Sequence, residues 1–578
     1  MNDLITLFKN DINNLVDELL NLKLINDFNK NSISIDFSSK SKQGDLSTNI
    51  LIILLNNNNN NNNKISEYVN KYFLNLGYVK NINIAKAGFI NIFIEKDFLI
   101  AQLKNLINEK KYYDNIKKQK INIEFVSANP TGPIHVAHMR GAVLGDVISS
   151  VMSFIGHEVT KEYYVNDAGS QISILGNSLF KRYKELFGYE IQLSDNEYPG
   201  EYLIDIAKDL RKLDGDKWLN HKDKMKLDDY FQSFAVKYLL EKIKKDLSLI
   251  NISFDKFTLE SNIVEENLIE KVFSSLKNND LIYEGYLEKP LGDEVLNWEP
   301  RKQLLFRSSN FFDDLDRPFK KDNGQWTYFA NDSAYHFDKY NRGYDKLINI
   351  WGADHIGYVP RMLSIVEAFT QKNNYLEIVI CQIVRLIKKD QQIRMSKRSG
   401  NFVTINEIFN EVGKDPLRYF MISTKSETPM DFNLDKVIEK NKDNPVFYCQ
   451  YAYARASSVI KKSNEFKKFK NFKNSLDNID KKTISEHEWE IILKLLTWPY
   501  VLISTAETKQ THKITNFLED LCYHFHSFWN KGKDDQSLRF INEDNPNQTI
   551  SKLIWIEAFR KILKQAFDII GIDSPESM

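Results

Sequence analysis

Glu124-Phe-Val-Ser-Ala-Asn-Pro-Thr-Gly-Pro-Ile-His-Val-Ala-His-Met-Arg140 is the stretch that decides how the middle of this chain folds. Apolar residues alternate with polar ones over residues 121–125, which predicts a half-buried strand. Residues 129–133 then break the strand, and apolar residues recur at helical spacing over residues 136–151. A strand, a tight turn and a helix N-terminus bind nucleotide phosphates well, because unpaired amide groups and the helix dipole face the anion.

Two histidines, His135 and His138, begin the predicted helix. They are three residues apart, so both imidazoles are expected on the same side of the first turn. Two hydrogen-bond donors beside a phosphate site suit chemistry at phosphorus. The alternative is that the two histidines only cap or fill the start of the helix.

A second segment, residues 394–401, reads Arg-Met-Ser-Lys-Arg-Ser-Gly-Asn. We expect a basic loop here, between an apolar strand at residues 378–383 and a helix at residues 405–412. Alone, such a run is often a solvated surface loop. Together, the two segments resemble the HIGH and KMSKS signatures of class I aminoacyl-tRNA synthetases.

Both signatures depart from the common form. Ala137 replaces the usual glycine, so the nucleotide base or ribose would approach slightly less closely. Arg394 and Arg398 replace the outer lysine and serine, while Met395, Ser396 and Lys397 stand. Neither change removes a hydrogen-bond donor.

Longer stretches narrow the resemblance to bacterial arginyl-tRNA synthetases. They are spread over the whole chain, at residues 44–49, 162–169, 326–332, 351–361, 443–448 and 571–578. The resemblance implies an α/β protein of three parts. A Rossmann-type parallel-sheet catalytic domain at 115–440, with a helical insertion at about 180–300, would lie between an N-terminal α+β tRNA-binding domain at 1–105 and an all-α anticodon-binding domain of the DALR type at 441–578.

Composition fits this organisation and excludes some classes. Lys+Arg and Asp+Glu each total 78, so any tRNA must be held by local basic patches rather than by net charge. The lysine-rich run at residues 461–473 is one such patch, or simply a solvated linker. The three cysteines are far apart, which argues against a zinc site or a disulfide framework. Residues 1–20 suggest an amphipathic helix rather than a signal peptide, and the apolar run at 50–55 is too short to span a bilayer, so we expect a cytoplasmic protein.

The resemblance implies that arginine attacks ATP to give arginyl-adenylate and diphosphate, and that the arginyl group then passes to the 2′-hydroxyl of the terminal adenosine of tRNA. His135, His138 and Lys397 would stabilise the charge that moves to the leaving diphosphate, with Arg394 in support. Mg²⁺ would arrive with the ATP phosphates, and we expect no protein-bound metal. The remaining ATP-binding candidates are Gly132, Pro133, Ala137, Gly352, Asp354, His355, Met395 and Ser396.

Recognition of arginine requires carboxylates, because a guanidinium group offers only donors. By motif position, Glu124 and Asp332 are the candidate anions, with Tyr328 beside them. Asn129 and His135 would hold the α-amino and carboxylate groups, and His355 is a further candidate. Tyr328 could instead be a half-buried sheet aromatic, and Asp332 a helix N-cap. Lysine would lose the bidentate geometry, so no editing domain is expected.

tRNA would be bound at both ends of the chain. Tyr448 and Tyr451 are candidate platforms for splayed anticodon bases, and Tyr453 and Trp529 are also plausible. Asn49 and Phe89 lie in the segments that match the family's N-terminal domain. The resemblance implies that tRNA must bind before arginine is activated, and we expect a monomer.

Three other readings compete with this one. A small-molecule nucleotidylyltransferase shares the two-histidine turn but not the 394–401 loop or the C-terminal helices. A synthetase of the glutamyl type would place basic residues where Glu124 and Asp332 stand. A tRNA-binding paralogue without activity would be expected to lack His135, His138 or Lys397, and all three are present.

Overall fold

The computed structural model describes two compact units, residues Lys118–Glu439 and residues Met1–Lys117 together with Lys440–Met578. The described residues are 3–37, 44–58, 62–85, 88–108, 113, 116–286, 301–393, 403–473, 476 and 479–578.

A five-stranded parallel sheet forms the centre of the unit at 118–439, with the strand order β12-β11-β5-β6-β7. The sheet confirms the Rossmann-type prediction, since its parallel strands are joined by helices and the strand order reverses between β5 and β11. Its strands are β5 (Lys120–Glu124), β6 (Glu158–Val165), β7 (Lys256–Leu259), β11 (Lys346–Gly352) and β12 (Leu376–Cys381).

The prediction that β5 is half-buried is wrong, because every residue of the strand after Lys120 is buried. A parallel sheet is covered by helices on both faces, so its central strands are buried on both sides. Asn122 and Glu124 are therefore buried polar residues, and both are hydrogen-bonded. The alternation of apolar and polar residues predicted the strand correctly, but it did not show that helices also cover the second face of the sheet.

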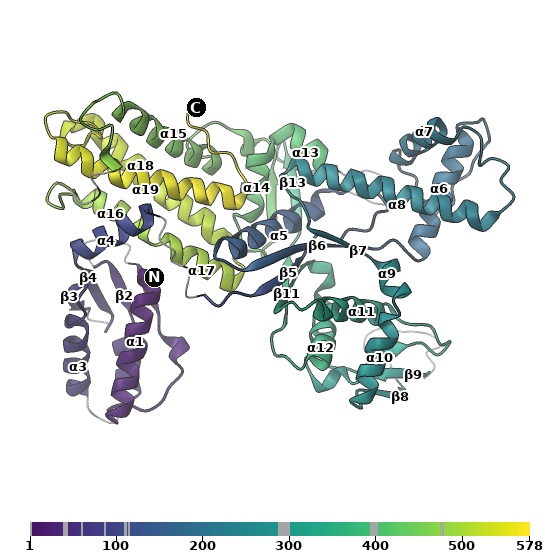
Figure 1. The fold of residues 1–578 in the computed structure, drawn as a ribbon, viewed down its shortest axis with the longest axis horizontal. Helices are drawn as coiled ribbons and strands as arrows, with labels where there is room; N and C mark the ends of the chain where they lie inside the picture. The colour runs from purple at the N-terminus through teal and green to yellow at the C-terminus, as the bar shows by residue number, and fades with distance from the viewer. Residues whose placement is uncertain are drawn as a thin grey trace. The chain divides into compact units, whose positions relative to one another are not determined.

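Helices cover both faces of this sheet (Figure 1). Helix α5 (Val136–Phe154) lies on one face, where Phe125 packs so closely on Gly145 that a Cβ there would come within 2.3 Å of the Phe125 ring. Helices α11 (Tyr328–Asn341) and α12 (Val359–Thr370) lie on the other face, toward which Glu124 points. Adjacent strand residues thus serve opposite faces.

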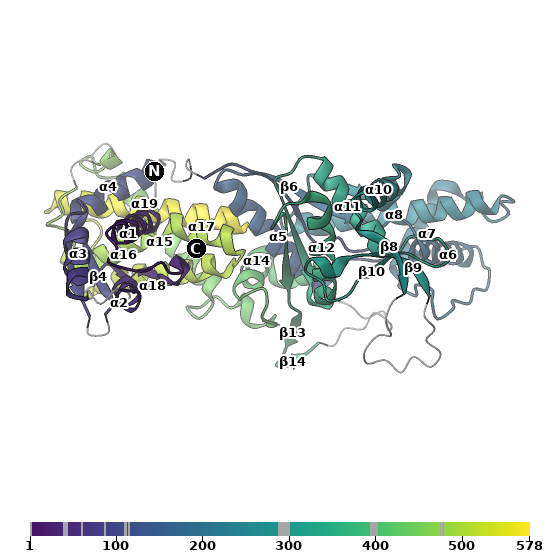
Figure 2. The ribbon, with the colours of Figure 1, turned by 90° about the horizontal axis from the view of Figure 1, so that it is seen from below.

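The stretch from 180 to 300 is not the single helical insertion that we expected. Three helices come first, but the chain then returns to the central sheet as β7, and a small antiparallel sheet follows beside α10 (Figure 2). Sequence periodicity missed β7 because a four-residue strand is too short to give a clear pattern. The elements are α6 (Ser170–Glu185), α7 (Tyr202–Asp214), α8 (Lys224–Leu249), α9 (Glu260–Glu265), α10 (Leu268–Asn278), β8 (Ile282–Tyr286), β9 (Lys302–Phe306) and β10 (Arg317–Lys320).

The segment after β12 also differs in detail from the prediction. The strand expected over 378–383 ends at Cys381, and two short strands intervene before the 394–401 loop. The helix predicted over 405–412 is found with those bounds. The elements are β13 (Val384–Lys388), β14 (Gln391–Gln392), α13 (Ile405–Val412), α14 (Lys414–Ile422) and β15 (Met430–Asn433).

The N-terminal part of the other unit combines helices with a sheet of order β1-β2-β4-β3. The predicted N-terminal helix is confirmed. Residues 56–63 are eight consecutive asparagines, and helices flank this run, the first ending at Asn56 and the second starting at Asn62. The elements are α1 (Leu4–Asn21), β1 (Ile35–Phe37), β2 (Leu46–Thr48), α2 (Ile50–Asn56), α3 (Asn62–Leu74), β3 (Val79–Ile84), β4 (Ile90–Ile94) and α4 (Lys96–Ile107).

The C-terminal part is helical, as predicted. Residues 491–506 belong to two helices, because the chain turns at Thr497 just before Pro499. Cys381, Cys449 and Cys522 are buried free thiols. No helix in the described ranges is long and apolar enough to span a membrane. The helices are α15 (Pro445–Ser463), α16 (Glu486–Leu496), α17 (Trp498–Thr508), α18 (His512–Asp534) and α19 (Pro546–Ile570).

Candidate active site

The two histidines lie at the start of α5, directly after the turn that leaves β5. His135 is the N-cap residue and His138 is three residues on, with their ring centroids 4.2 Å apart. The expected same-side arrangement is confirmed. His138 Nδ1 also accepts a hydrogen bond from the backbone N–H of His135 at 3.4 Å, so the capping role weighed as an alternative is present too.

The loop at 394–401 lies outside the described residues, and with it Arg394, Met395, Ser396 and Lys397. The chain that follows the loop is anchored on the histidine turn. His135 and Thr404 form an antiparallel bridge, and the N–H of Val136 donates to the Val403 carbonyl at 3.3 Å. Val403 and Thr404, which follow the second signature segment in the chain, therefore lie beside the histidine turn.

Other candidate residues for ATP surround the same strand ends. Gly132, Pro133 and Ala137 are at least partly exposed beside the histidines. Gly352, Asp354 and His355 follow β11, which pairs with β5, and all three are exposed. The Asp354 carboxylate folds back over Gly352, where an added Cβ would come within 2.5 Å of Asp354 Oδ1.

Glu124, the last residue of β5, is a buried carboxylate with two partners. Its Oε2 lies 2.6 Å from Nζ of Lys339, whose side chain is 0% exposed, and its Oε1 accepts from the Ser127 hydroxyl at 3.0 Å. Lys339 also donates to Asn349 Oδ1 at 3.3 Å. The negative charge of Glu124 is therefore balanced inside the protein.

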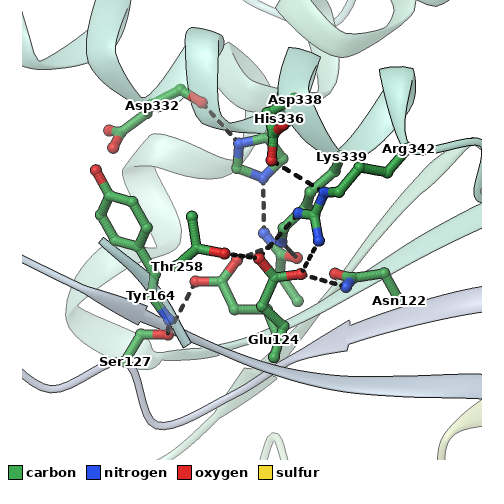
Figure 3. A network of polar contacts seen from close by, with 12 residues as sticks. Asn122, Glu124, Ser127, Tyr164, Thr258, Asp332, His336, Asp338, Lys339 and Arg342 are labelled. Atoms are coloured by element: carbon green, nitrogen blue, oxygen red, sulfur yellow. Dashed lines mark hydrogen bonds and ion pairs between the residues drawn. The ribbon is translucent and has the colours of Figure 1, made fainter. Parts of the chain in front are cut away.

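A chain of polar contacts continues from Lys339 along α11 (Figure 3). Asn349 lies 2.8 Å from His336 Nε2, and His336 Nδ1 lies 2.8 Å from the Asp332 carbonyl oxygen. Burial and the charge of Lys339 lower the pKa of His336 to about 4. A neutral imidazole with Nδ1 protonated satisfies both contacts, so α11 is held rigidly against the sheet.

Asp332 lies in the second turn of α11 and is not an N-cap, because Thr327 caps this helix. Its Oδ2 accepts from the Tyr358 hydroxyl at 2.7 Å. Burial raises the pKa of Asp332 to about 7; the Tyr358 hydrogen bond opposes this, and Glu260 and Glu124 add to it. Tyr328, one turn earlier, is 76% exposed at the helix start, so it is not a half-buried sheet aromatic.

Glu260 is a site residue that the sequence analysis missed. It is 9% exposed, directly follows β7, and accepts from Asn331 Nδ2 at 3.1 Å. Burial raises the pKa of Glu260, and Asp167 adds to the shift. Its position at the carboxyl end of a sheet strand could have identified it, had β7 been recognised.

Tyr164 marks the place where these carboxylates converge. Burial raises the pKa of Tyr164, and the charges of Glu260, Asp332 and Glu124 add to the effect. Figure 3 shows that the side chain of Tyr164 extends from the strand beside Glu124 and Ser127 toward Asp332. A carboxylate with a raised pKa among other carboxylates favours a cationic ligand, because a cation would relieve the repulsion.

Asn129 is exposed in the turn before the histidines, where its amide donates to Gln171 Oε1 at 2.9 Å. To turn toward a ligand, the Asn129 side chain must give up this contact with Gln171.

In the other unit, the Asn49 side chain binds Ser34 N–H and the Ser32 carbonyl, at 2.8 and 3.1 Å. Phe89 is 40% exposed nearby in the same sheet region.

The aromatic candidates on α15 differ in exposure. Tyr448 and Tyr451 are half-buried, whereas Tyr453 is 2% exposed and packs on Phe567, so Tyr453 is a core residue and not a platform. The Arg455 guanidinium lies over the rings of Tyr451 and Trp529, 4.1 and 4.8 Å from their centroids. Tyr448, Tyr451 and Trp529 thus share one polar-aromatic surface.

A parallel sheet with a two-histidine turn after its central strand is an arrangement typical of class I aminoacyl-tRNA synthetases. Residues 102–448 match the model of the class I tRNA synthetase (R) catalytic domain. Residues 2–94 match the arginyl tRNA synthetase N-terminal domain, and residues 449–578 match the DALR anticodon binding domain.

Curated relatives agree along nearly the whole chain. An arginine–tRNA ligase of Bartonella henselae is 39% identical over 566 residues, 96% of this chain and 95% of the relative. One from Jannaschia sp. is 36% identical over 551 residues, 95% of each chain. The solved arginyl-tRNA synthetase of Thermus thermophilus shares the fold over 100% of both chains, with a TM-score of 0.73 at 16% identity. This chain belongs to the arginyl-tRNA synthetase family, and its activity is arginine–tRNA ligation.

Proposed function

We propose that the unit at 118–439 activates arginine with ATP and passes it to the 2′-hydroxyl of the terminal adenosine of tRNA(Arg). One observation carries the assignment of the site. The histidine turn, Thr404 bridged to it, and the carboxylates around Tyr164 support this assignment, because they gather at the carboxyl edge of one parallel sheet.

The guanidinium group of arginine would bind at Asp332 and Glu260, with the exposed ring of Tyr328 closing over it. The raised pKa values of the two carboxylates support this placement, because a bound guanidinium group would offset the cost of ionising them in a buried site. Asn129 and His135 would hold the α-amino and carboxylate groups, and His355 lies on the neighbouring strand end. Glu124 belongs to the same site through its contact with Ser127.

ATP would bind across the ends of β5 and β11, with its phosphates at the start of α5. His135 and His138 would donate to the phosphates as charge moves to the leaving diphosphate, and Lys397 and Arg394 would act from the loop. Gly132, Pro133, Ala137, Met395 and Ser396 would line the nucleotide, and Gly352, Asp354 and His355 the ribose. Mg²⁺ would enter on the ATP phosphates rather than in a protein cage.

tRNA would be bound by the unit that contains both chain ends. Tyr448 and Tyr451 would stack on anticodon bases, and Asn49 and Phe89 would contact another part of the tRNA. The protein would act in the cytoplasm as a monomer, with domains at 1–105, 115–440 and 441–578, and would require tRNA before it activates arginine. The assignment of the arginine pocket depends neither on the oligomeric state nor on the need for tRNA.

The experiment is arginine-dependent exchange of diphosphate into ATP, with and without tRNA(Arg), alongside the other nineteen amino acids. Exchange only with arginine, and only with tRNA, would support the proposal. His138→Asn should lower exchange ~10²–10³-fold, and Asp229→Asn, an exposed change on α8, should leave it unaltered. Exchange with another amino acid would refute the pocket assignment. No exchange by folded protein would favour a tRNA-binding paralogue without activity.

A further inference from the structure

Arg140, in the second turn of α5, is a buried cation that the fold surrounds with neutral groups. Its side chain is 1% exposed, and its guanidinium group donates five hydrogen bonds. The acceptors, at distances between 2.7 and 3.4 Å, are the backbone carbonyls of Gln382, Met421, Lys425 and Thr428 and the hydroxyl of Thr424. Among the described residues, no carboxylate forms an ion pair with Arg140.

Two other arginines of the same unit do have carboxylate partners. Arg418 is fully buried and donates to Asp146 Oδ2 at 2.6 Å, and Arg342 donates to both oxygens of Glu162. A buried charge is costly unless it is paired or hydrogen-bonded. The neutral dipoles around Arg140 lower this cost, but they carry no net charge. The positive charge of Arg140 is therefore not cancelled within the described part of the chain.

The charge of Arg140 is felt at the carboxyl edge of the sheet. Burial raises the pKa of the Cys381 thiol, at the end of β12, to about 11, and the charge of Arg140 opposes this shift. Arg140 follows His138 by two residues on α5, so its Cα lies only about 3 Å further along the helix axis. Charges this close to a helix start interact appreciably with a bound anion, because the effective dielectric constant of protein is about 20 rather than 80.

We propose that Arg140 supplies a fixed positive charge, which strengthens binding of the ATP phosphates and stabilises the diphosphate as it leaves. In the reaction, an oxygen of the arginine carboxylate bonds to the α-phosphorus and the bond from this phosphorus to the bridging oxygen breaks. Negative charge therefore accumulates on the diphosphate. All five donors of Arg140 are occupied within the fold, so the residue acts through its charge and without contact. The inference rests on the proposed function, which makes ATP the ligand.

Binding of a charged and of a neutral nucleoside separates an effect of charge from an effect of shape. The charged probe is an ATP analogue with a methylene group between the α- and β-phosphorus, which cannot react, and the neutral probe is adenosine. Calorimetry on the full chain with Mg²⁺, with and without tRNA(Arg), gives both dissociation constants. In Arg140→Gln we expect the dissociation constant of the analogue to rise ~10-fold or more, and that of adenosine to stay unchanged. Arg140→Lys keeps the charge and should retain most of the affinity for the analogue.

A second pair of variants cancels the charge without removing Arg140. Cys381→Asp places a carboxylate beside the guanidinium group, which favours the ionised form of the new carboxyl. Cys381→Asn has nearly the same shape without the charge, and is the matched control. We expect Cys381→Asp to bind the analogue more weakly than Cys381→Asn, with equal affinity for adenosine. The kcat of arginine-dependent diphosphate exchange should be ~10-fold or more lower in Cys381→Asp than in Cys381→Asn.

Two results would overturn the inference. One is that Arg140→Gln weakens adenosine as much as the analogue, which would mean that Arg140 only shapes the nucleotide pocket. The other is that Cys381→Asp and Cys381→Asn bind the analogue equally well. If thermal melting shows that Arg140→Gln does not fold, the Cys381 pair decides alone. If the wild-type protein binds neither probe, the proposed function fails and this inference fails with it, whereas normal binding without the expected differences refutes the inference only.

Discussion

Glu162 and Asp332 are carboxylates of the same unit in opposite electrostatic situations. Burial alone would raise the pKa of Glu162, but Lys339 and a bidentate contact with Arg342, at 2.9 Å for each bond, lower it to about 2. Burial raises the pKa of Asp332 to about 7, and its nearest charged neighbours are other carboxylates. The first carboxylate has its cation in the fold, whereas the second is suited to a cation that arrives as substrate.

The largest expected effect comes from unpairing the first carboxylate. Arg342→Ala leaves Glu162 buried without its bidentate partner, and should lower the free energy of unfolding by about 3–5 kcal/mol. Denaturant titration measures this change. Lys212→Ala, which breaks the exposed ion pair with Asp209, is the matched control and should have no measurable effect. Equal effects of the two variants would contradict the role assigned to Arg342.

Asp332→Asn should produce the opposite pattern. The variant keeps the shape of the pocket but loses the charge. The lost interaction is worth about 2–5 kcal/mol, so kcat/KM for arginine should fall ~30-fold or more. The fold should not be weakened, because the ionised form of this carboxylate is disfavoured by burial. Steady-state exchange kinetics and denaturant titration together check both statements. A large loss of stability with normal kinetics would place Asp332 among the structural carboxylates.

The pH dependence of arginine binding should follow Asp332. Arginine stays protonated throughout, and it binds the ionised carboxylate, whose pKa in the free protein is about 7. Binding therefore releases a proton below this pH, and KM for arginine should rise by up to ~10-fold for each pH unit below 7. Asp332→Asn should flatten the profile between pH 5 and 7, and an unchanged profile would assign the titration elsewhere.

The raised pKa of Asp332 affects the stability of the fold in the opposite direction to arginine binding. A carboxyl whose folded pKa exceeds its ordinary value of 3.8 favours the folded state most at low pH, and this contribution is lost as the pH rises to about 7. Glu162 behaves in the opposite way, since its stabilisation is present above pH 4.5 and is lost as the pH falls toward 2. Arg342→Ala should accordingly remove part of the acid-induced loss of stability.

The smallest expected effect is that of Tyr358→Phe. The variant removes the hydroxyl that donates to Asp332 at 2.7 Å, a contact that stabilises the ionised form by about 0.5–1.5 kcal/mol. The midpoint of the KM profile should therefore move upward by up to ~1 pH unit. A shift downward would mean that the hydroxyl stabilises the protonated carboxyl instead.

The sequence by itself determined the local features and the family. The strand, turn and helix around residues 121–151 follow from periodicity and turn residues, and His135 and His138 face the same way because they are three residues apart on one helix. The resemblance in scattered segments identified the class of enzyme and its overall architecture. These features depend on neighbours in the chain, which a sequence displays directly.

Only the tertiary structure decided which charged residues meet. Glu124 and Lys339 are 215 positions apart, and Glu260 reaches the pocket only because the short strand β7 joins the sheet. The sequence analysis therefore did not show the buried Lys339 beside Glu124, and it overlooked Glu260. Burial and long-range pairing determine which of these carboxylates are ionised and which are paired, and neither is a property of local sequence.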